Sequence, residues 1–385
     1  MKITFVLPCV GLAGGIRVTA IYAEKLKQRG HQVCVVSLPS APIQLKEQIK
    51  SLLRGQGWLR PTLGSHFDGR DIEHRILEKH RPVEASDVPD ADVVVATWWE
   101  TAEWIARFPA SKGAKVYFIQ HHEAIFPGQP QERVKATWFL PMYKIVISNW
   151  LVDVARTFYG DDGVSLVPNS VDTKQFFAPP RNKQPVPTVG LMYVDLLWKG
   201  SDICLKAFEI AARKIPNLRL VAFGSKTPSP NLPLPAGATF IHCPPQDQIK
   251  NVYAQCDAWL FGSRSEGFGM PLLESMACRT PVIGTPAGAA PELLKEGAGI
   301  LVNPEDPEDM AQAIERVCQL SDQEWQAMSQ AAYNRAVSYT WDDATDLFEA
   351  ALYQAMEMAQ SNAQTSQSKG LAVESTLDEV ESQVS

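Results

Sequence analysis

The sequence lacks the features of several classes of protein. Its seven cysteines are odd in number and include no C-x-x-C pair, which argues against a disulfide framework and against a structural zinc site. No stretch reaches the roughly 18 apolar residues that a membrane-spanning helix needs. The apolar run after Met1 is interrupted at Pro8 and has no small-residue cleavage site behind it, so a buried first strand is expected rather than a secretory signal. These absences favour a protein of the reducing cytoplasm.

Basic residues are too few, and too poorly placed, for a nucleic-acid-binding protein. The formal net charge is −7, with +3 on residues 1–170 and −10 on the remainder. Such an acidic second half cannot neutralise a phosphate backbone, so binding of nucleic acid is not expected. The length of 385 residues suits two domains of ordinary size.

Short apolar runs alternate with helical periods along the chain, and this pattern predicts an α/β protein with parallel sheets covered by helices. The apolar runs are continuous, as expected for strands buried on both faces. The predicted strands are 3–7, 33–37, 93–97, 116–120, 145–148 and 165–167, then 188–192, 218–223, 239–241, 258–261, 282–284 and 299–302. The predicted helices include 16–29, 201–214, 246–255, 270–277, 307–320 and 322–337.

A proline-rich stretch separates the two runs of alternation. Four prolines lie between Phe177 and Pro187, too many for a regular element. The segment 171–187 is therefore predicted to link an N-terminal domain, 1–170, to a C-terminal domain, 188–338. A last helix is predicted at 342–359, and the polar segment 360–385 is predicted to be disordered, with a docking helical peptide at 371–384 as the alternative.

Glycines follow the first predicted strand and open the first predicted helix. Gly11, Gly14 and Gly15, with Arg17, would let the main chain approach a ligand, and the helix start would attract an anion. The spacing is not G-x-G-x-x-G, and no acidic residue follows the second strand, so NAD binding is disfavoured. A tight strand–helix turn explains these glycines equally well.

A second glycine-containing loop lies between the strand 258–261 and the helix that begins near Pro271. Its N–H groups at 267–270 would converge on one point, where the helix start could take a diphosphate. Glu266 in the loop could hold sugar hydroxyls, and Glu274 on the helix could hold ribose hydroxyls. The alternative is two unrelated acids, one of which only complements the helix dipole.

Glu266 and Glu274, eight residues apart around Gly-Phe-Gly-Met-Pro, resemble the E-x7-E motif of retaining glycosyltransferases of the GT-B fold. This resemblance covers about 1–359 and implies two Rossmann-like domains facing across a cleft, with the C-terminal helix crossing back to the N-terminal domain. Further segments that fit the family are Pro168–Asp172, Lys199-Gly200, Thr280–Ile283, Pro291-Glu292, 299–302 and Trp341.

The resemblance also implies roles for particular residues. Glu266 and either His121 or His122 would act on the transferred sugar. The donor-binding residues would be Gly14, Gly15, Arg17, Lys199, Gly224, Arg264, Gly267, Phe268, Gly269, Met270 and Glu274.

One family feature is missing. Lys199 occupies the position of the lysine that neutralises the donor diphosphate, but the position of its partner arginine holds Val194. Another cation, Arg264 or Arg17, would have to help, or the helix start would carry more of the diphosphate binding.

The segment 120–127, QHHEAIFP, resembles a subgroup that includes rhamnosyltransferases of surface-polysaccharide synthesis. His121, His122 or Glu123 would face the sugar there, although polar residues after a strand are often only solvated turn residues. Trp98 and Trp99 follow the preceding strand and could stack on a sugar or pack in the core.

The function implied by the resemblance is transfer of a hexose or deoxyhexose from a nucleoside-diphosphate sugar to a glycan or lipid-linked acceptor in cell-envelope or exopolysaccharide synthesis. No metal ion or other cofactor is expected, because the aspartate pairs Asp161-Asp162 and Asp342-Asp343 are adjacent rather than spaced as D-x-D. The alternatives are a nucleotide-sugar epimerase and a non-catalytic subunit that binds a sugar nucleotide.

The segment 45–60 is cationic and amphipathic, and it could rest on the inner face of the plasma membrane, where a lipid-linked acceptor would be met. A solvated surface helix would show the same pattern.

Overall fold

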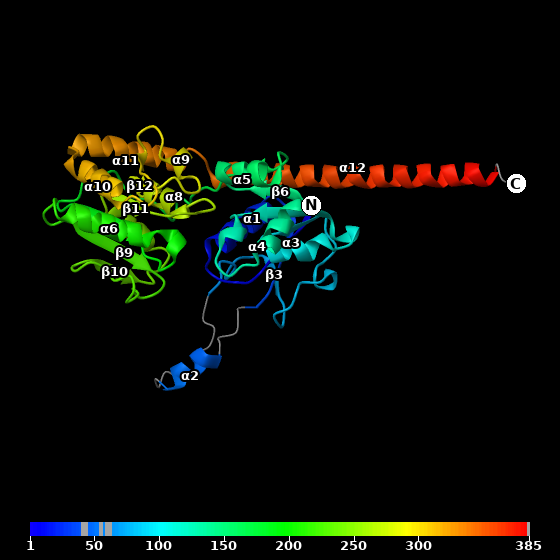
Figure 1. Ribbon diagram of the computed structural model, residues 1–385, viewed down its shortest axis with the longest axis horizontal. Helices are drawn as coiled ribbons and strands as arrows, with labels where there is room; N and C mark the ends of the chain where they lie inside the picture. Colours follow the sequence, from blue (N-terminus) through cyan, green and yellow to red (C-terminus); the bar gives the residue numbers. More distant parts are fainter. Residues whose placement is uncertain (40–44, 54–56, 58–63, 383–385) are drawn as a thin grey trace. The chain divides into compact units, whose positions relative to one another are not determined.

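The computed structural model describes residues 1–39, 45–53, 57 and 64–382, which form two α/β units (Figure 1). Unit 1 comprises residues 1–146, 155–165 and the segment from 345 onward, and unit 2 comprises 147–154 and 166–344. Both units have the predicted α/β architecture. Each predicted strand is found within two residues of its expected ends.

Unit 1 contains a seven-stranded sheet in the order β3-β2-β1-β4-β5-β6-β7, and its strand pairs from β3 to β6 are parallel. The central strands are Val- and Ile-rich and buried on both faces; β4, with the sequence VVVA, is buried throughout. The elements are β1 (Lys2–Leu7), α1 (Gly14–Gln28), β2 (Gln32–Ser37), α2 (Leu45–Leu53), β3 (Glu73–Ile76), β4 (Val93–Ala96), α3 (Trp99–Ala106), β5 (Ala114–Ile119), α4 (Gln131–Ala136), β6 (Tyr143–Val146), α5 (Asn149–Tyr159) and β7 (Ser165–Leu166).

Unit 2 contains a six-stranded, all-parallel sheet in the order β10-β9-β8-β11-β12-β13. Helices α6 and α10 pack on each other, and Trp325 of α11 is fully buried in the same core. The elements are β8 (Thr188–Met192), α6 (Ser201–Ala212), β9 (Arg219–Gly224), β10 (Thr239–His242), α7 (Ile249–Ala254), β11 (Ala258–Phe261), α8 (Met270–Ala277), β12 (Val282–Gly284), α9 (Ala290–Leu293), β13 (Gly299–Leu301), α10 (Pro307–Gln319) and α11 (Asp322–Val337).

Both sheets have a topological switch point, where the strand order reverses between two neighbouring strands. It lies between β1 and β4 in unit 1 and between β8 and β11 in unit 2. Ligands of open α/β sheets bind outside the carboxyl ends of the strands at such points. The loops after β8 and β11 carry Lys199, Arg264 and residues 266–269, so the fold places these predicted site residues at this edge.

The closing helix is α12 (Trp341–Ser382), and from Thr345 onward it belongs to unit 1 as predicted. Phe348 is fully buried and stacks on Tyr22, with the ring centroids 4.3 Å apart, and it also contacts Phe5 and Phe118. The helix continues beyond residue 359 to Ser382, where a disordered tail was predicted, through residues that lack proline and include good helix formers.

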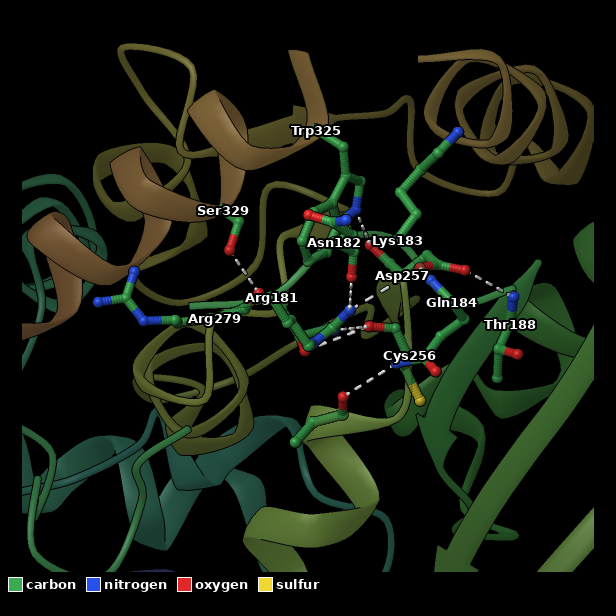
Figure 2. A network of polar contacts seen from close by, with 12 residues as sticks. Arg181, Asn182, Lys183, Gln184, Thr188, Cys256, Asp257, Arg279, Trp325 and Ser329 are labelled. Carbon is green, nitrogen blue, oxygen red and sulfur yellow. Dashed lines mark hydrogen bonds and ion pairs between the residues drawn. The ribbon is translucent and has the colours of Figure 1, made fainter. Parts of the chain in front are cut away.

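The proline-rich segment also differs from its prediction, because residues 171–187 are part of unit 2 rather than a linker between two domains. Figure 2 shows the network that holds them, which centres on Cys256 and Asp257. The carboxylate of Asp257 accepts hydrogen bonds from the main-chain N–H groups of Gln184, at 2.7 Å, and Thr188, at 2.9 Å. Prolines exclude ladder hydrogen bonds, but polar contacts of the intervening residues bind the segment to the domain.

Among the described residues, no helix combines the length and the apolar character needed to cross a bilayer. All seven cysteines are free thiols.

Candidate functional site

In unit 2, two loops at the switch point interlock through their main chains. One follows β8 and contains a short 3-10 turn, η5 (Leu197–Lys199); the other follows β11 and begins at Gly262. Gly200 has φ +62°, and a Cβ on it would lie only 1.7 Å from the carbonyl oxygen of Gly262. A side chain at this position would therefore separate the loops.

Lys199 and Glu266, which come from these two loops, form an ion pair. The Nζ atom of Lys199 lies 2.8 Å from Oε1 and 2.9 Å from Oε2 of Glu266, and the hydroxyl of Ser263 donates to Oε1 at 2.9 Å. Glu266 is 7% exposed. A small cavity beside the pair is lined by both side chains together with Met192, Trp259, Phe261 and Pro271. The structure thus brings together the predicted diphosphate-binding cation and the predicted sugar-binding acid.

The start of α8 lies directly after Glu266. Gly269 adopts the left-handed conformation, with φ +96°, and within the described chain no side chain caps the helix. The preceding loop is held in place by its carbonyls: Gly267 accepts from the Ser148 hydroxyl at 2.7 Å, and Phe268 accepts from the N–H of Ala289 at 2.9 Å. With the carbonyls directed inward, the loop can offer N–H groups and the positive end of the helix dipole to an anion.

Glu274 is the fifth residue of α8 and is 7% exposed. Its Oε2 accepts a hydrogen bond from the hydroxyl of Tyr253 on α7 at 2.9 Å. Gly224 ends β9, and a Cβ there would lie 2.6 Å from the carbonyl oxygen of Tyr193. Glycine at position 224 therefore lets the loop after β8, which begins at Tyr193, pass close to the end of β9.

Arg264, which was considered as a second cation for the diphosphate, is engaged by other groups of unit 2. Its guanidinium is bound by two carboxylates, those of Asp202 and Glu305, and by the carbonyl of Leu197. The hydrogen bond with Asp202 raises the pKa of Arg264 and lowers the pKa of Asp202. The loops supply no arginine at Val194 either, which leaves Lys199 as the cation in contact with Glu266.

In unit 1, the start of α1 meets the carboxyl end of β5. The amide of Gln120 donates to the carbonyl of Gly15 at 3.1 Å, and the hydroxyl of Thr19 donates to the same oxygen at 2.9 Å. Gly14 is exposed and Arg17 is half-buried on the first turns of the same helix. Gly14, Gly15 and Arg17 thus lie at the sheet edge expected for a ligand site.

The two histidines after β5 have different surroundings. His121 packs on Phe126, with centroids 4.5 Å apart, and Phe126 stacks on the half-buried Trp98. The Nε2 atom of His122 lies 2.8 Å from the hydroxyl of Tyr159, and burial, followed by the charge of Lys135, lowers the pKa of His122. Phe126 therefore contacts both His121 and Trp98, whereas His122 belongs to an aromatic cluster with Tyr159.

Two other sequence candidates are parts of the core. Glu123 is 2% exposed, and its carboxylate accepts from the N–H of Trp99 at 2.8 Å. Trp99 is buried as well. Both side chains are thus enclosed in unit 1.

A D-x-D spacing does occur in this sequence, at Asp90-Ala-Asp92, contrary to the expectation based on the adjacent aspartate pairs. Asp90 is paired with Lys112 at 2.8 Å, and Asp92 accepts from the N–H of Lys2 at 2.6 Å. Both aspartates precede β4, at the amino end of the strand, which is the edge opposite to the switch-point loops of unit 1.

Ser263 and Tyr253 are site residues that the sequence analysis missed. Ser263 lies three residues before Glu266, a spacing that local hydrogen bonding could have suggested. The contact of Tyr253 with Glu274 has no signal in the sequence, since it joins two helices 21 residues apart.

Comparison with known sequences shows which proteins unit 2 is similar to. The family model "Glycosyl transferases group 1" matches residues 174–335, which form most of unit 2. The D-inositol 3-phosphate glycosyltransferase of Mycolicibacterium smegmatis is 30% identical over 171 residues, which cover 41% of this chain and 38% of that protein. The Mycobacterium leprae enzyme of the same name is 32% identical over 164 residues, covering 38% of this chain and 37% of its own length. The match thus spans about two fifths of the length of these curated relatives.

Solved structures extend the likeness to both units. Sucrose-phosphate synthase from Thermosynechococcus elongatus superposes with a TM-score of 0.67 at 16% identity, covering 93% of this chain and all of that one. HepE of Anabaena, solved in complex with UDP-glucose, superposes with a TM-score of 0.66 at 18% identity, covering 94% of this chain and all of that one. At this identity the likeness shows the fold, which is the GT-B fold that the resemblance implied.

Proposed function

We propose that this chain is a retaining glycosyltransferase that moves a hexose or deoxyhexose from a nucleoside-diphosphate sugar to a glycan or lipid-linked acceptor. The observation that carries the proposal is the Lys199–Glu266 pair, at a switch-point edge and directly before the uncapped start of α8. The family match over the same unit and the UDP-glucose complex of HepE support it. Synthesis of cell-envelope or surface polysaccharide in the cytoplasm is the setting that fits such a donor and acceptor.

In the proposed reaction, the bond from the sugar C1 to the diphosphate breaks, and the acceptor hydroxyl attacks C1 from the same face. The proton of the acceptor passes to the departing phosphate oxygen. Lys199 and the N–H groups at 267–270 would stabilise the charge that develops on the diphosphate, which is electrostatic preorganisation. Glu266 would hold sugar hydroxyls and Glu274 the ribose.

Unit 1 would supply the acceptor side of the reaction. His121 is the better candidate to meet a sugar, because it shares its contact with Phe126 with the half-buried Trp98, whereas His122 is engaged with Tyr159. The expectation of a cleft shared by the two units stays a prediction.

No metal ion is required in this proposal. The acids of the unit 2 site already have partners: Glu266 has Lys199, Glu274 has Tyr253, and Asp202 and Glu305 share Arg264. Binding of a cation would have to displace these contacts.

The test is donor turnover by the full chain with UDP-, GDP- and dTDP-sugars, with and without glycan and lipid-linked acceptors, in EDTA and in Mg²⁺. We expect acceptor-dependent release of nucleotide in both media, slowed at least about tenfold by Lys199→Ala. Glu274→Ala should weaken donor binding by a similar factor. Parent rates in both variants would contradict the site, and turnover only in Mg²⁺ would contradict the metal-free reaction.

A second candidate is a non-catalytic subunit that binds a sugar nucleotide, which the valine at position 194 favours. Binding of a nucleotide sugar without turnover on any acceptor would support it. Rearrangement of the donor sugar without an acceptor would instead indicate an epimerase.

We also propose peripheral contact of α2 with an anionic membrane. Ile49, Leu52 and Leu53 of this helix are 49%, 49% and 83% exposed, while the polar Gln48 and Ser51 are buried. The rest of the predicted segment, at 54–56 and 58–60, lies outside the described residues. Co-sedimentation with vesicles containing phosphatidylglycerol should be lost in Leu52→Ser/Leu53→Ser; retention would contradict the contact.

A further inference from the structure

Arg264 makes as many contacts as its guanidinium has N–H groups. Nη1 lies 2.8 Å from Oδ1 of Asp202 and 2.5 Å from the carbonyl oxygen of Leu197. Nη2 lies 2.8 Å from Oδ2 of Asp202 and 2.8 Å from Oε2 of Glu305, and Nε lies 2.5 Å from Oε1 of Glu305. All three guanidinium nitrogens thus contact protein oxygens, and a phosphate would have to displace one of these contacts.

These contacts join three separate segments to the loop after β11. Leu197 belongs to η5, which ends at Lys199; Asp202 lies on the first turn of α6; and Glu305 follows β13 with a left-handed φ of +58°. The main chain adds a further link, because the N–H of Arg264 donates to the carbonyl of Trp198 at 2.9 Å. Arg264 therefore holds the η5 turn through hydrogen bonds to the carbonyls of Leu197 and Trp198, the two residues before Lys199.

The same turn is fixed from its other side by the close approach of Gly200 and Gly262. The hydroxyl of Ser263, which donates to Glu266, also lies 3.5 Å from the carbonyl of Lys199. With its backbone held on both sides, Lys199 can direct a long, flexible side chain to one place, which lowers the entropy cost of ordering it.

We propose that Arg264 is a positioning residue, which clamps the η5 turn so that the ammonium group of Lys199 is presented to the donor diphosphate, and that Arg264 itself does not touch the phosphates. This inference rests on the proposed function of the site. Arg264 then contacts the loop after β8, in which Val194 replaces the family's arginine, but it does not take over that arginine's role of binding the diphosphate. An arginine suits this task because its planar fork holds two carboxylates and a carbonyl at fixed angles, which a lysine ammonium cannot do.

The direction in which one substitution changes nucleotide affinity distinguishes the positioning role of Arg264 from direct phosphate binding. Asp202→Asn keeps the size of the side chain but loosens the grip on Arg264. If Arg264 clamps the turn, this change weakens binding of the nucleoside diphosphate. If Arg264 binds phosphate directly, the same change frees N–H groups and strengthens binding.

The experiment is titration calorimetry of the full chain with UDP, GDP and dTDP, using the nucleotide that the parent protein binds best. We expect Asp202→Asn, Glu305→Gln and Arg264→Lys each to weaken it by about three- to tenfold. The matched control is Asp162→Asn, which removes a similar partner from Arg156 in unit 1 and should change nothing.

A double-mutant cycle distinguishes positioning from a general loss of structure. In a Lys199→Met background, Asp202→Asn should have no further effect on diphosphate binding, because the clamp acts through Lys199. Equal effects in both backgrounds, or tighter binding by Asp202→Asn, would overturn the inference. If the parent protein binds none of the nucleotides, the proposed function fails instead, so the two failures are distinguishable.

Discussion

Glu123 is a carboxylic acid at an interior position of unit 1. Its Oε2 accepts from the N–H of Trp99 at the start of α3, at 2.8 Å, and from the hydroxyl of Tyr117 at 3.3 Å. Burial raises its pKa well above the ordinary value, and these two hydrogen bonds offset only part of that rise. The Glu123 side chain therefore stabilises the start of α3, and its burial favours the protonated form of the carboxyl group.

This raised pKa predicts how stability depends on pH. A carboxyl whose pKa is higher in the folded state binds its proton more tightly when folded, so its contribution is complete below its ordinary pKa of 4.5 and is lost as pH rises through the raised value. Glu123→Gln cannot ionise. Urea unfolding from about pH 4 to about pH 8 should show the variant gaining stability relative to the parent as pH rises.

The matched control for that experiment is Glu132→Gln, because the Glu132 side chain is 87% exposed. Its unfolding free energy should follow that of the parent protein across the whole pH range. If the curves of Glu123→Gln and the parent also run in parallel, the buried carboxyl does not titrate as argued.

Among the elements, the proline-rich segment before β8 shows how side chains can replace regular secondary structure. Arg181 lies over the ring of Trp325, with 4.4 Å from its Cζ to the centroid, and donates to the carbonyl of Cys256 and to Thr280. Lys183 donates to the carbonyls of Cys318 and Leu320 at the end of α10. The segment is thereby a fixed part of the unit 2 core rather than a hinge.

Arg181→Met should therefore lower the free energy of unfolding by about 2 kcal/mol, because it removes the hydrogen bonds to the Cys256 carbonyl and to Thr280 and removes a cation over Trp325. Arg213→Met, on the exposed side of the same unit, should change it by less than about 0.5 kcal/mol. Equal stability of the two variants in urea unfolding would show that the segment is held loosely.

At this scale the sequence predicts strands better than connections. Buried parallel strands leave continuous apolar runs, and these were found throughout both sheets. β3 was missed because it is an edge strand with the polar sequence EHRI. The proline-rich segment was predicted as a linker because composition reports only local preference. Its attachment to unit 2 depends on Asp257 and Trp325, which lie far away in the chain.

For the molecule as a whole, the sequence predicts which loops meet but not how their charges are paired. Parallel α/β topology alone brings the loops after β8 and β11 to one edge, so Lys199 and Glu266 could be placed in the same site. The ion pairs of Arg264 with Asp202 and Glu305 could not be predicted, since they depend on side-chain geometry between four segments.

The charge of the whole chain leads to a last prediction, on the salt dependence of nucleotide binding. The net charge is −7, so at a distance the protein repels an anionic nucleotide, whereas Lys199 and the start of α8 attract it at contact. Exposed charges are screened beyond about 10 Å at 0.1 M salt, whereas half-buried pairs are screened much less. Added salt therefore weakens the repulsion more than the contact.

Raising NaCl from about 20 mM to about 300 mM should consequently lower nucleotide affinity by less than about twofold, or raise it, in contrast to the steep loss that a basic cleft would show. Titration calorimetry at several salt concentrations measures this directly. Lys199→Met serves as the control, because its affinity should be lower at every salt concentration with a similar slope. A loss of more than about tenfold would mean that several exposed cations attract the nucleotide, and Lys199 would then be one contributor among many.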